Sequence, residues 1–449
     1  MGDKLLVRAY SVGVGDCIYV RIPNGDDDFR ILIDCGSKGR IALLKNTVKH
    51  LEDDLAEEGG SVVKPIDLLV VTHRHQDHIK GFDPKIFKNI PIKNIWLSAA
   101  MNEDHIQAEK SLALNDMATT AMRGIEARGL SLSAELQTLV SMYSINNQDA
   151  MKALRVDFPK SKGATPVYVH AGMSSEDLSL PLENAKIHVL APENDIDGYY
   201  LGDDVDETLR AFRDEMKFFT HRSVSIDKGF PDNISANDFR TLQSRMLSNA
   251  FAFAEKDSSI QNNVSVVLMV EWRGRRLLFT GDAEWEGKFR TGKHNGSWNV
   301  MWKERSEHLK DPIDFLKIGH HGSINATPWA PSKDSDYEVN QILDAILPLS
   351  SPGVEPVAQA LVSTKRSTIY PSIPAADLLV ELGRRVANTK VYYDELKKLD
   401  PDLENKAPFD EYWDYELLDC LKQPQPWRAD LESTITGKEY MEVEFDPAD

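Results

Sequence analysis

The run HRHQDH, which begins at position 73, constrains this chain more than any other feature of its sequence. It follows residues 66–72, a short apolar stretch that is typical of a buried strand ending at a site. Imidazole nitrogens and carboxylate oxygens are ligands that zinc and similar metals accept. Because side chains two positions apart in such a loop can point to the same side, His73 and His75 can hold one ion. Asp77 and His78 can turn toward a second ion. The alternative is a solvent-exposed polar loop, which this density of ligand residues disfavours.

The bulk composition predicts an ordinary soluble, cytoplasmic protein. Hydrophobic residues make up 41% of the 449 residues and charged residues 27%. No apolar run approaches the roughly 20 residues needed to span a bilayer, and the N-terminus lacks a signal-peptide pattern, so we expect no membrane association. Cys17, Cys35 and Cys420 form no CxxC pair, which argues against a disulfide framework or a thiolate zinc site. A chain of this length predicts one large elaborated domain or two to three smaller ones.

The net charge of −19 is unevenly distributed. Taken alone, it argues against gripping nucleic acid by broad electrostatic attraction. Residues 394–449, however, carry 17 acidic and 6 basic residues, which is more than half of the excess. We therefore predict an acidic C-terminal extension over residues 394–449, partly folded and able to dock a protein partner. The preceding body, residues 1–393, is only mildly acidic and can still accept a nucleic-acid substrate.

The pattern of apolar residues predicts alternating strands and helices. Strands are expected at residues 4–11, 17–22, 30–34, 66–72, 166–170, 186–190, 264–272, 275–280, 314–318, 360–363, 390–393 and 440–445. Helices are expected at residues 41–55 and 375–386, with helical insertions at about 101–156 and 203–257. This order suits a four-layer α/β sandwich with helical insertions, but periodicity alone does not select it over other α/β folds.

Several sequence blocks resemble one known superfamily. The run at residues 73–78 is similar to the HxHxDH motif of the metallo-β-lactamase superfamily. Further blocks resemble, in the same order, the branch that includes the hydrolase domain of ComEC-type DNA-uptake proteins; they lie at residues 12–17, 31–36, 262–265, 279–284 and 316–323. The resemblance is scattered from residue 4 to about residue 393 and leaves out the insertions and the extension. It implies an αββα metallo-β-lactamase sandwich for residues 1–393.

The resemblance also implies a site with two divalent metal ions, zinc or manganese. His73 and His75 would hold the first ion, Asp282 would bridge the two, and Asp77 and His78 would hold the second with one of His320 and His321. We favour His321 as the ligand and His320 as a donor that faces the substrate. Supporting roles, in orienting ligands, ordering loops or contacting substrate, are expected for Asp34, Asn263, Ser265, Lys317 and Ser323. Asp16 is expected near the site by analogy.

Two departures from the family pattern affect this site. Many members carry a further histidine ligand between the first motif and the bridging aspartate. The candidates here, His105, His170, His188 and His221, sit in no recognisable motif, so the first ion is expected to be weakly held and open to substrate. Where the branch tends to have a histidine-containing turn, this chain has residues 370–374, so a substrate or transition-state contact is either missing or replaced by Tyr370 or Ser372.

The expected chemistry is hydrolysis by a metal-activated water. Asp77 would accept or orient the water's proton, and His320 would donate to the developing oxyanion or the leaving group. By analogy with the branch, the first hypothesis is a phosphodiesterase or nuclease that acts on nucleic acid or nucleotides. A second is a small-molecule hydrolase for a phosphorylcholine-type ester, a lactone or a thioester, with a pocket closed by the helical insertions. A third is an effector subunit of a larger assembly that docks through its acidic extension.

Overall fold

The computed structural model describes residues 4–39, 41–56, 62–127, 132–143, 145–202, 236–330, 338–349, 354, 356–364, 373–387 and 440–448. Some sequence predictions therefore lie outside the described residues. They are His221, Tyr370, Ser372, Cys420, the strand at residues 390–393, the first part of the second insertion and most of the acidic extension.

The larger sheet has seven strands in the order β12-β1-β2-β3-β4-β5-β6. Their bounds are β1 Leu5–Tyr10, β2 Ile18–Asn24, β3 Asp27–Ile33, β4 Ile66–Val71, β5 Ile92–Ser98, β6 Thr165–Val169 and β12 Tyr440–Phe445. Strands β3 to β6 run parallel, while β12, β1, β2 and β3 pair antiparallel. The strand β5 was not predicted, because Lys93 and Asn94 interrupt its apolar run.

The smaller sheet has five strands in the order β11-β10-β9-β8-β7. Their bounds are β7 Ala185–Ala191, β8 Val267–Trp272, β9 Arg275–Phe279, β10 Phe315–Lys317 and β11 Gln359–Leu361. The predicted hairpin is present as β8 and β9. Strand β8 begins three residues later than predicted, because helix α8 (Ala236–Asn263) continues to the residue before Val264.

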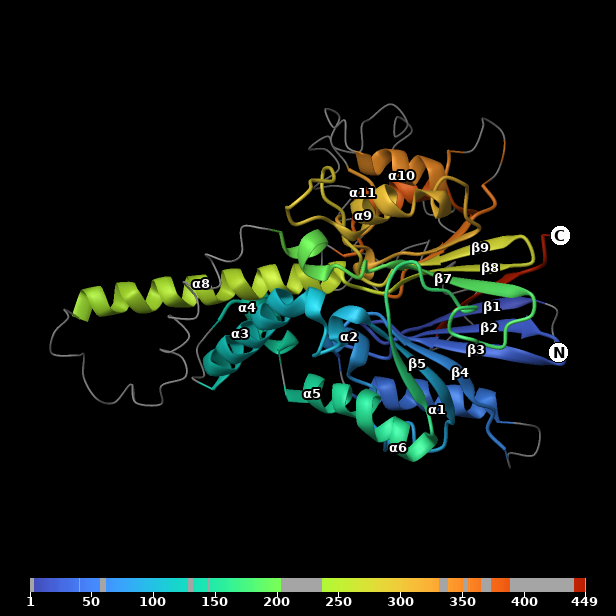
Figure 1. Ribbon diagram of the computed structural model, residues 1–449, viewed down its shortest axis with the longest axis horizontal. Helices are drawn as coiled ribbons and strands as arrows, with labels where there is room; N and C mark the ends of the chain where they lie inside the picture. The colour runs from blue at the N-terminus through green and yellow to red at the C-terminus, as the bar shows by residue number, and fades with distance from the viewer. Residues whose placement is uncertain are drawn as a thin grey trace.

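The two sheets pack face to face and helices cover both outer surfaces (Figure 1). The core between the sheets includes Val20, Val70 and Leu268, and alternate residues of the larger sheet, such as Leu69, face a second core under the helices. The helices on the larger sheet are α1 Ile41–Leu55, α5 Ile145–Lys152 and α6 Phe158–Lys162. Those on the smaller sheet are α9 Ser297–Glu304, α10 Glu338–Ile346 and α11 Ala376–Gly383. The fold is thus the predicted four-layer αββα sandwich, although α9 and α10 were not predicted.

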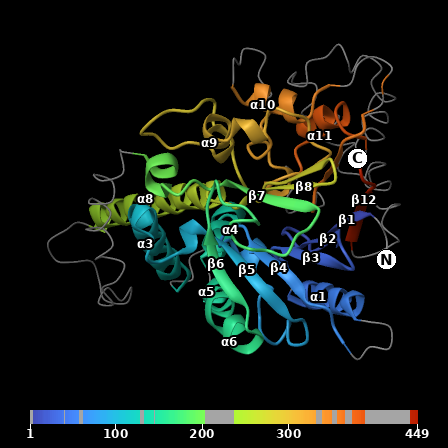
Figure 2. The ribbon, with the colours of Figure 1, turned by 45° about the vertical axis from the view of Figure 1, so that its right-hand side comes forward.

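Helical insertions extend from one end of the sandwich, where Figure 2 shows α3 and α8 side by side. The first insertion contains α3 Glu109–Glu126, α4 Ala134–Met142, α5 and a π-helical turn at Ala153–Asp157. Buried residues of α3, α4 and α8, among them Met122, Val140 and Ala254, form a separate small core. The insertions therefore pack on one another beside the end of the sheets at which β4 finishes.

The last described segment returns to the start of the chain. Strand β12 pairs with β1 in the register Leu5↔Phe445, and the two ends of the chain lie close together in Figure 1. Beneath them the buried Arg8 forms ion pairs with Asp54 of α1 and Glu442 of β12. Residues 440–445 therefore form the strand that the sequence predicted, and the structure makes it an edge strand of the main sheet. No helix among the described residues is long and apolar enough to cross a membrane.

Candidate metal centre

The histidine run occupies the loop between β4 and the short helix α2 (Gln76–Ile79). Strand β4 lies between two parallel neighbours and is buried along its whole length. Its carboxyl end therefore delivers the loop to the edge of the sheet, where α/β folds commonly place their ligands. His73, His75, Asp77 and His78 are all buried there.

One group of ligand atoms comes from His73, His75 and Asp282, all within 4.8 Å of one another. The Nε2 atom of His73 lies 3.0 Å from Nδ1 of His75 and 3.7 Å from Oδ2 of Asp282. Asp282 follows β9, and Gly281 before it has φ 53°, a left-handed conformation that glycine adopts without strain. The hairpin β8–β9 thus carries Asp282 across to the loop after β4.

A second group comes from Asp77, His78 and His321, again within 4.8 Å. The Nε2 atom of His321 lies 3.0 Å from Oδ2 of Asp77. The Nε2 atom of His78 lies 3.1 Å from Oδ2 of Asp282, so Asp282 contacts both groups. The structure therefore brings together all six residues that the sequence assigned to metal binding.

The donor atoms of these groups fit a bound cation. Buried atoms without a hydrogen-bond partner among the described residues include Nε2 of His75, Oδ1 of Asp77 and Nδ1 of His321. Leaving several buried polar atoms unsatisfied is costly, and such atoms are rare in native proteins. Coordination of divalent ions by imidazole and carboxylate would satisfy them. These residues are therefore suited to hold transition metals.

The buried surroundings shift the pKa values of two ligand histidines, His73 and His78, in opposite directions. Burial, together with the neighbouring His78 and His75, lowers the pKa of His73 well below its usual value, so that its imidazole is neutral. Burial also opposes a charge on His78, but the carboxylates of Asp282 and Asp34 outweigh it and raise the pKa of His78 well above its usual value. In the absence of metal, His78 therefore tends to hold a proton where a metal would bind.

Asp34 lies directly behind His78. Its Oδ2 is 2.7 Å from Nδ1 of His78 and accepts a 2.6 Å hydrogen bond from the hydroxyl of Thr72. Its Oδ1 accepts a 2.8 Å hydrogen bond from the backbone N–H of Thr72. A carboxylate bonded to one imidazole nitrogen turns the other nitrogen toward a metal and makes it more basic. Asp34 is thus placed to orient His78.

Lys317, one of the residues expected to support the site, is not placed to contact a substrate. Its ammonium group is buried and lies 3.0 Å from Oδ2 of Asp16, and it also donates to the carbonyl of Ile318 at 2.9 Å. A substrate cannot reach a lysine that is enclosed and neutralised in this way. Asp16, whose role the sequence left undefined, is the partner of this buried lysine. One of its carboxylate oxygens also lies within 4.8 Å of ligand atoms of His78 and Asp282.

The two adjacent histidines after β10 point to different surroundings. The side chain of His321 is 1% exposed and belongs to the second ligand group, whereas that of His320 is 23% exposed and belongs to neither group. Nδ1 of His320 lies 3.5 Å from Oε1 of Glu284. Burial lowers the pKa of His320, and the carboxylates of Asp282 and Glu284 raise it by more, so the net shift is upward.

Glu284 is the last residue of the block at residues 279–284, for which the sequence predicted no separate role. It is buried and accepts hydrogen bonds from Asn262 at 2.8 Å and Ser259 at 2.8 Å. Asn263 holds the same segment, since its Oδ1 accepts from the backbone N–H of Glu284. The signal that could have identified Glu284 is its spacing, two positions after Asp282 in a loop that follows a strand.

The remaining predicted residues lie around the centre. Ser265 bonds both the backbone N–H of Asp282 and Nδ1 of His73, at 3.1 and 3.3 Å. Ser323 donates from its hydroxyl to Asn325 and from its backbone to the carbonyl of His320, and so closes the turn that carries the histidine pair. These contacts order the loops.

No further histidine joins the two groups among the described residues. His105 caps the 3-10 turn Ile106–Ala108, His170 bonds the carbonyl of Ala171, and His188 lies against Glu271. The first ligand group therefore has only His73, His75 and Asp282 from the described part of the chain.

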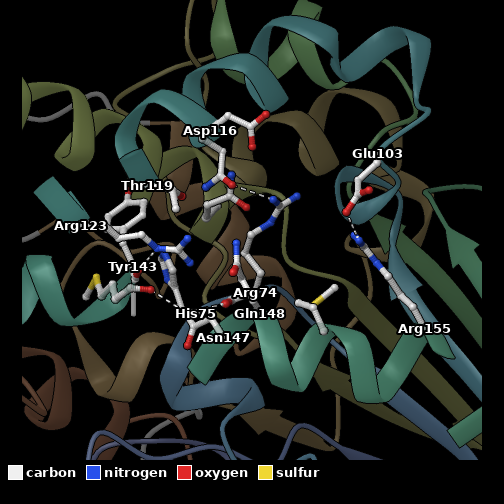
Figure 3. Close-up of a pocket in the computed structure, with 14 residues that line it drawn as sticks. Arg74, His75, Glu103, Asp116, Thr119, Arg123, Tyr143, Asn147, Gln148 and Arg155 are labelled. Atoms are coloured by element: carbon white, nitrogen blue, oxygen red, sulfur yellow. Dashed lines mark hydrogen bonds and ion pairs between the residues drawn. The ribbon is translucent and has the colours of Figure 1, made fainter. Parts of the chain in front are cut away.

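A cavity of about 160 Å³ adjoins the centre at His75 (Figure 3). Its walls come largely from the first helical insertion, and three arginines, Arg74, Arg123 and Arg155, line it. The insertion therefore covers one side of the centre. It places a charged pocket next to the first ligand group.

Comparisons with known proteins agree with this fold over part of the chain. Residues 10–84 match the family model of the Metallo-beta-lactamase superfamily, and this span contains Asp34 and the whole histidine run. No curated protein sequence matches the chain.

Two solved structures are distantly similar. The metallo-beta-lactamase fold protein YhfI from Bacillus subtilis is 9% identical with a TM-score of 0.26, and the match covers 69% of each chain. A protein of unknown function from Enterococcus faecalis V583 is 11% identical with a TM-score of 0.28, and the match covers 70% of this chain and 49% of that one.

Proposed function

We propose that this chain is a metal-dependent hydrolase that cleaves phosphodiester bonds with an activated water. The observation that carries the proposal is the pair of buried His/Asp groups that meet at Asp282. Two adjoining ligand sets of this kind are typical of enzymes that use two metal ions for hydrolysis. The match of residues 10–84 to the Metallo-beta-lactamase superfamily supports the same chemistry.

The residues divide into ligands and proton-handling groups. His73 and His75 would hold one ion, Asp77, His78 and His321 a second, and Asp282 would contact both. Bound zinc or manganese would supply the Lewis acidity that makes water a nucleophile near neutral pH. Oδ2 of Asp77 lies 3.0 Å from Nε2 of His321 and 3.2 Å from the ammonium group of Lys38, so Oδ1 is the oxygen that would bind metal or orient the attacking water.

His320 is placed to act on the leaving group. It is partly exposed beside the ligand groups, and its Nδ1 lies 3.5 Å from Oε1 of Glu284. That contact leaves Nε2 facing Asp282 at 4.0 Å, on the side where a substrate would lie. His320 would donate a proton to the departing oxygen, and Glu284 would hold the ring in the orientation that allows it.

The choice of a phosphodiester is supported by charge beside the centre. An ester or lactone without charge would gain little from the three arginines next to His75, whereas a phosphate-containing substrate would be attracted to them. A small-molecule ester or lactone remains the second candidate, because a cavity of about 160 Å³ suits a compact group.

The test is a cleavage screen on protein loaded with zinc or manganese. We expect hydrolysis of bis-p-nitrophenyl phosphate and of short oligonucleotides, and none of p-nitrophenyl acetate. The double variant Asp77→Ala/His78→Ala should lose bound metal by elemental analysis and lose activity by at least about 100-fold. His170→Ala, outside the centre, is the matched control and should keep both. Activity that is indifferent to metal would overturn the proposal, and cleavage of only the acetate or a lactone would select the second candidate.

A further inference from the structure

The cavity beside His75 has a composition that the hydrolytic centre alone does not explain. We call it the arginine pocket and define it by Arg74, Arg123, Arg155, Tyr143, Asn147 and His75. Figure 3 shows Arg74 between Arg123 on one side and Arg155 on the other. The acidic residues that line it are Glu103 and Asp116, both exposed at its rim. A chain with a net charge of −19 thus places three guanidinium groups against two carboxylates in one small cavity.

Arg74 makes hydrogen bonds to neutral groups and no direct ion pair among the described residues, although the buried carboxylate of Asp257 is near enough to interact with its charge. It donates 2.8 and 2.6 Å hydrogen bonds to the side-chain oxygen of Asn115 and the carbonyl of Ala100. Its Nε is buried with no hydrogen-bond partner among the described residues. Arg74 lies between His73 and His75 in the chain and lines the pocket together with His75.

Arg123 is the arginine best placed to meet a ligand. It projects from α3 and its Nε lies 3.5 Å from the carbonyl of Tyr143. Neither Arg123 nor Arg74 forms an ion pair with a carboxylate within the described part of the chain. Arg155 differs, since its guanidinium pairs with Glu103 and bonds the carbonyl of Met101 at the outer edge. Two of the three positive charges therefore remain without a paired carboxylate.

We propose that the arginine pocket binds a phosphate group that flanks the scissile phosphodiester, so that the substrate carries a second phosphate. This inference rests on the proposed function for the position of the scissile bond. A guanidinium presents two parallel N–H donors that match phosphate oxygens, and charge-assisted hydrogen bonds of this kind are the strong ones. His75 lines the pocket and belongs to the first ligand group, so the pocket and the centre share this residue and lie next to each other. The substrate class is then a nucleotide or oligonucleotide with adjacent phosphates, and not an isolated diester.

The experiment compares three thymidine dinucleotides that differ only in terminal phosphates: TpT, pTpT and TpTp. In the metal-loaded wild type, we expect kcat/KM for at least one of the phosphorylated dinucleotides to exceed that for TpT by about 10-fold or more. The variant Arg123→Gln should remove this preference: kcat/KM for the preferred phosphorylated dinucleotide should fall by about 10-fold or more, and that for TpT by much less. Arg123→Lys, which keeps the charge but not the forked donors, should restore part of it.

Arg245→Gln is the matched control, because Arg245 is an exposed residue of α8 that does not line the pocket. It should preserve the preference. Equal kcat/KM for all three dinucleotides in the wild type would overturn the proposal. So would an Arg123→Gln variant that slows all three equally, since that result would indicate a general loss of structure.

A binding measurement separates this inference from the proposed hydrolysis. If no dinucleotide is cleaved, the proposed function fails and the pocket is judged by calorimetric titration of inorganic phosphate into metal-depleted protein. Binding that weakens about 10-fold or more in Arg123→Gln, and is unchanged in Arg245→Gln, supports the pocket as a phosphate site. No phosphate binding, binding indifferent to Arg123→Gln, or acetate binding as tight as phosphate binding would overturn it.

Discussion

His78 lies between two buried carboxylates. Its Nδ1 is 2.7 Å from Asp34 and its Nε2 is 3.1 Å from Asp282. Burial disfavours a charge on the ring, but these carboxylates raise its pKa well above the usual value of 6.5. A raised pKa stabilises the metal-free fold below a pH of about 6.5, and this stabilisation is lost as the pH rises through the folded pKa. A metal would have to displace that proton.

Metal affinity should therefore rise with pH. Below the folded pKa of His78, one proton leaves as metal binds, so the zinc association constant should increase roughly tenfold per pH unit. Competition with a chelator between pH 6 and pH 8 measures this slope. His78→Asn should bind zinc more weakly and with a smaller slope. An affinity that does not change with pH in the wild type would contradict the assignment.

Gly36 is required for a close approach of two loops. A Cβ on Gly36 would lie 2.2 Å from the backbone carbon of Asp77 and the nitrogen of His78. We expect Gly36→Ala to displace the metal-binding loop, to lower stability by about 1–3 kcal/mol and to weaken zinc binding. Thermal unfolding and zinc titration give both readouts.

Gly163→Ala is the control for that prediction. Gly163 has a left-handed φ of 70°, but no atom lies within 4 Å of the position that a Cβ would take there. The variant should lose some stability through backbone strain and keep normal zinc affinity. Unchanged zinc binding in Gly36→Ala would show that the close contact does not position the ligands.

Among the elements, the insertion helices meet at one buried carboxylate. Asp257 of α8 accepts hydrogen bonds from Asn115 of α3 at 2.7 Å and from Tyr143, just after α4, at 2.8 Å. Burial raises the pKa of Asp257, and these donors together with Arg74 partly offset that effect. Asn115 also holds Arg74, so the same network connects the insertion to the histidine run.

Asp257→Ala should loosen this part of the molecule. Three buried donors, from Asn115, Tyr143 and Gln261, would lose this acceptor, and each group left unsatisfied costs about 1–3 kcal/mol. We expect faster hydrogen exchange in α3 and α8 by mass spectrometry, with little change in β4. Tyr143→Phe removes only one of these bonds and should have a smaller effect, about 1 kcal/mol. Exchange in α3 that stays at the wild-type rate would show that the helices are held by apolar packing alone.

At the scale of the whole molecule, strand β12 links the two sheets. It pairs with β1 at the edge of the larger sheet, and the ring of Phe445 packs against Phe315 of the smaller sheet at 5.9 Å between centroids. Arg8 adds an ion pair to Glu442 and lies 4.3 Å from the ring centre of Tyr440. The last strand is therefore an integral part of the sandwich.

Phe445→Ala should destabilise the whole protein by about 3 kcal/mol, because it empties a buried position between the sheets. Val443→Ala, at a half-buried position of the same strand, should cost less. Urea unfolding followed by tryptophan fluorescence measures both. Equal, near-zero effects would show that β12 contributes little to stability.

The local ligand run could be predicted from the sequence alone, and the αββα sandwich from the resemblance that accompanies it. The run at residues 73–78 is contiguous and follows an apolar strand, so its chemistry required no knowledge of distant contacts. The later residues Asp282, His320 and His321 were assigned by resemblance. Their local sequence does not indicate that they lie near the loop after β4 in the fold. The strand β5 and helices α9 and α10 were missed, since their polar interruptions or short lengths blur the periodicity that predicts an element.

The pairing of residues that are distant in the sequence became known only from the three-dimensional fold. The fold buries Lys317 against Asp16 and away from substrate, sets Glu284 against His320, and brings Arg123 beside His75. These contacts join segments up to about three hundred residues apart, and they depend on sheet order, strand register and helix packing. Local sequence carries the preference of a residue for metal, solvent or core. Which polar side chains pair with one another depends on which arrangement of the chain gives the most buried charges a partner at once. That arrangement is a property of the whole fold.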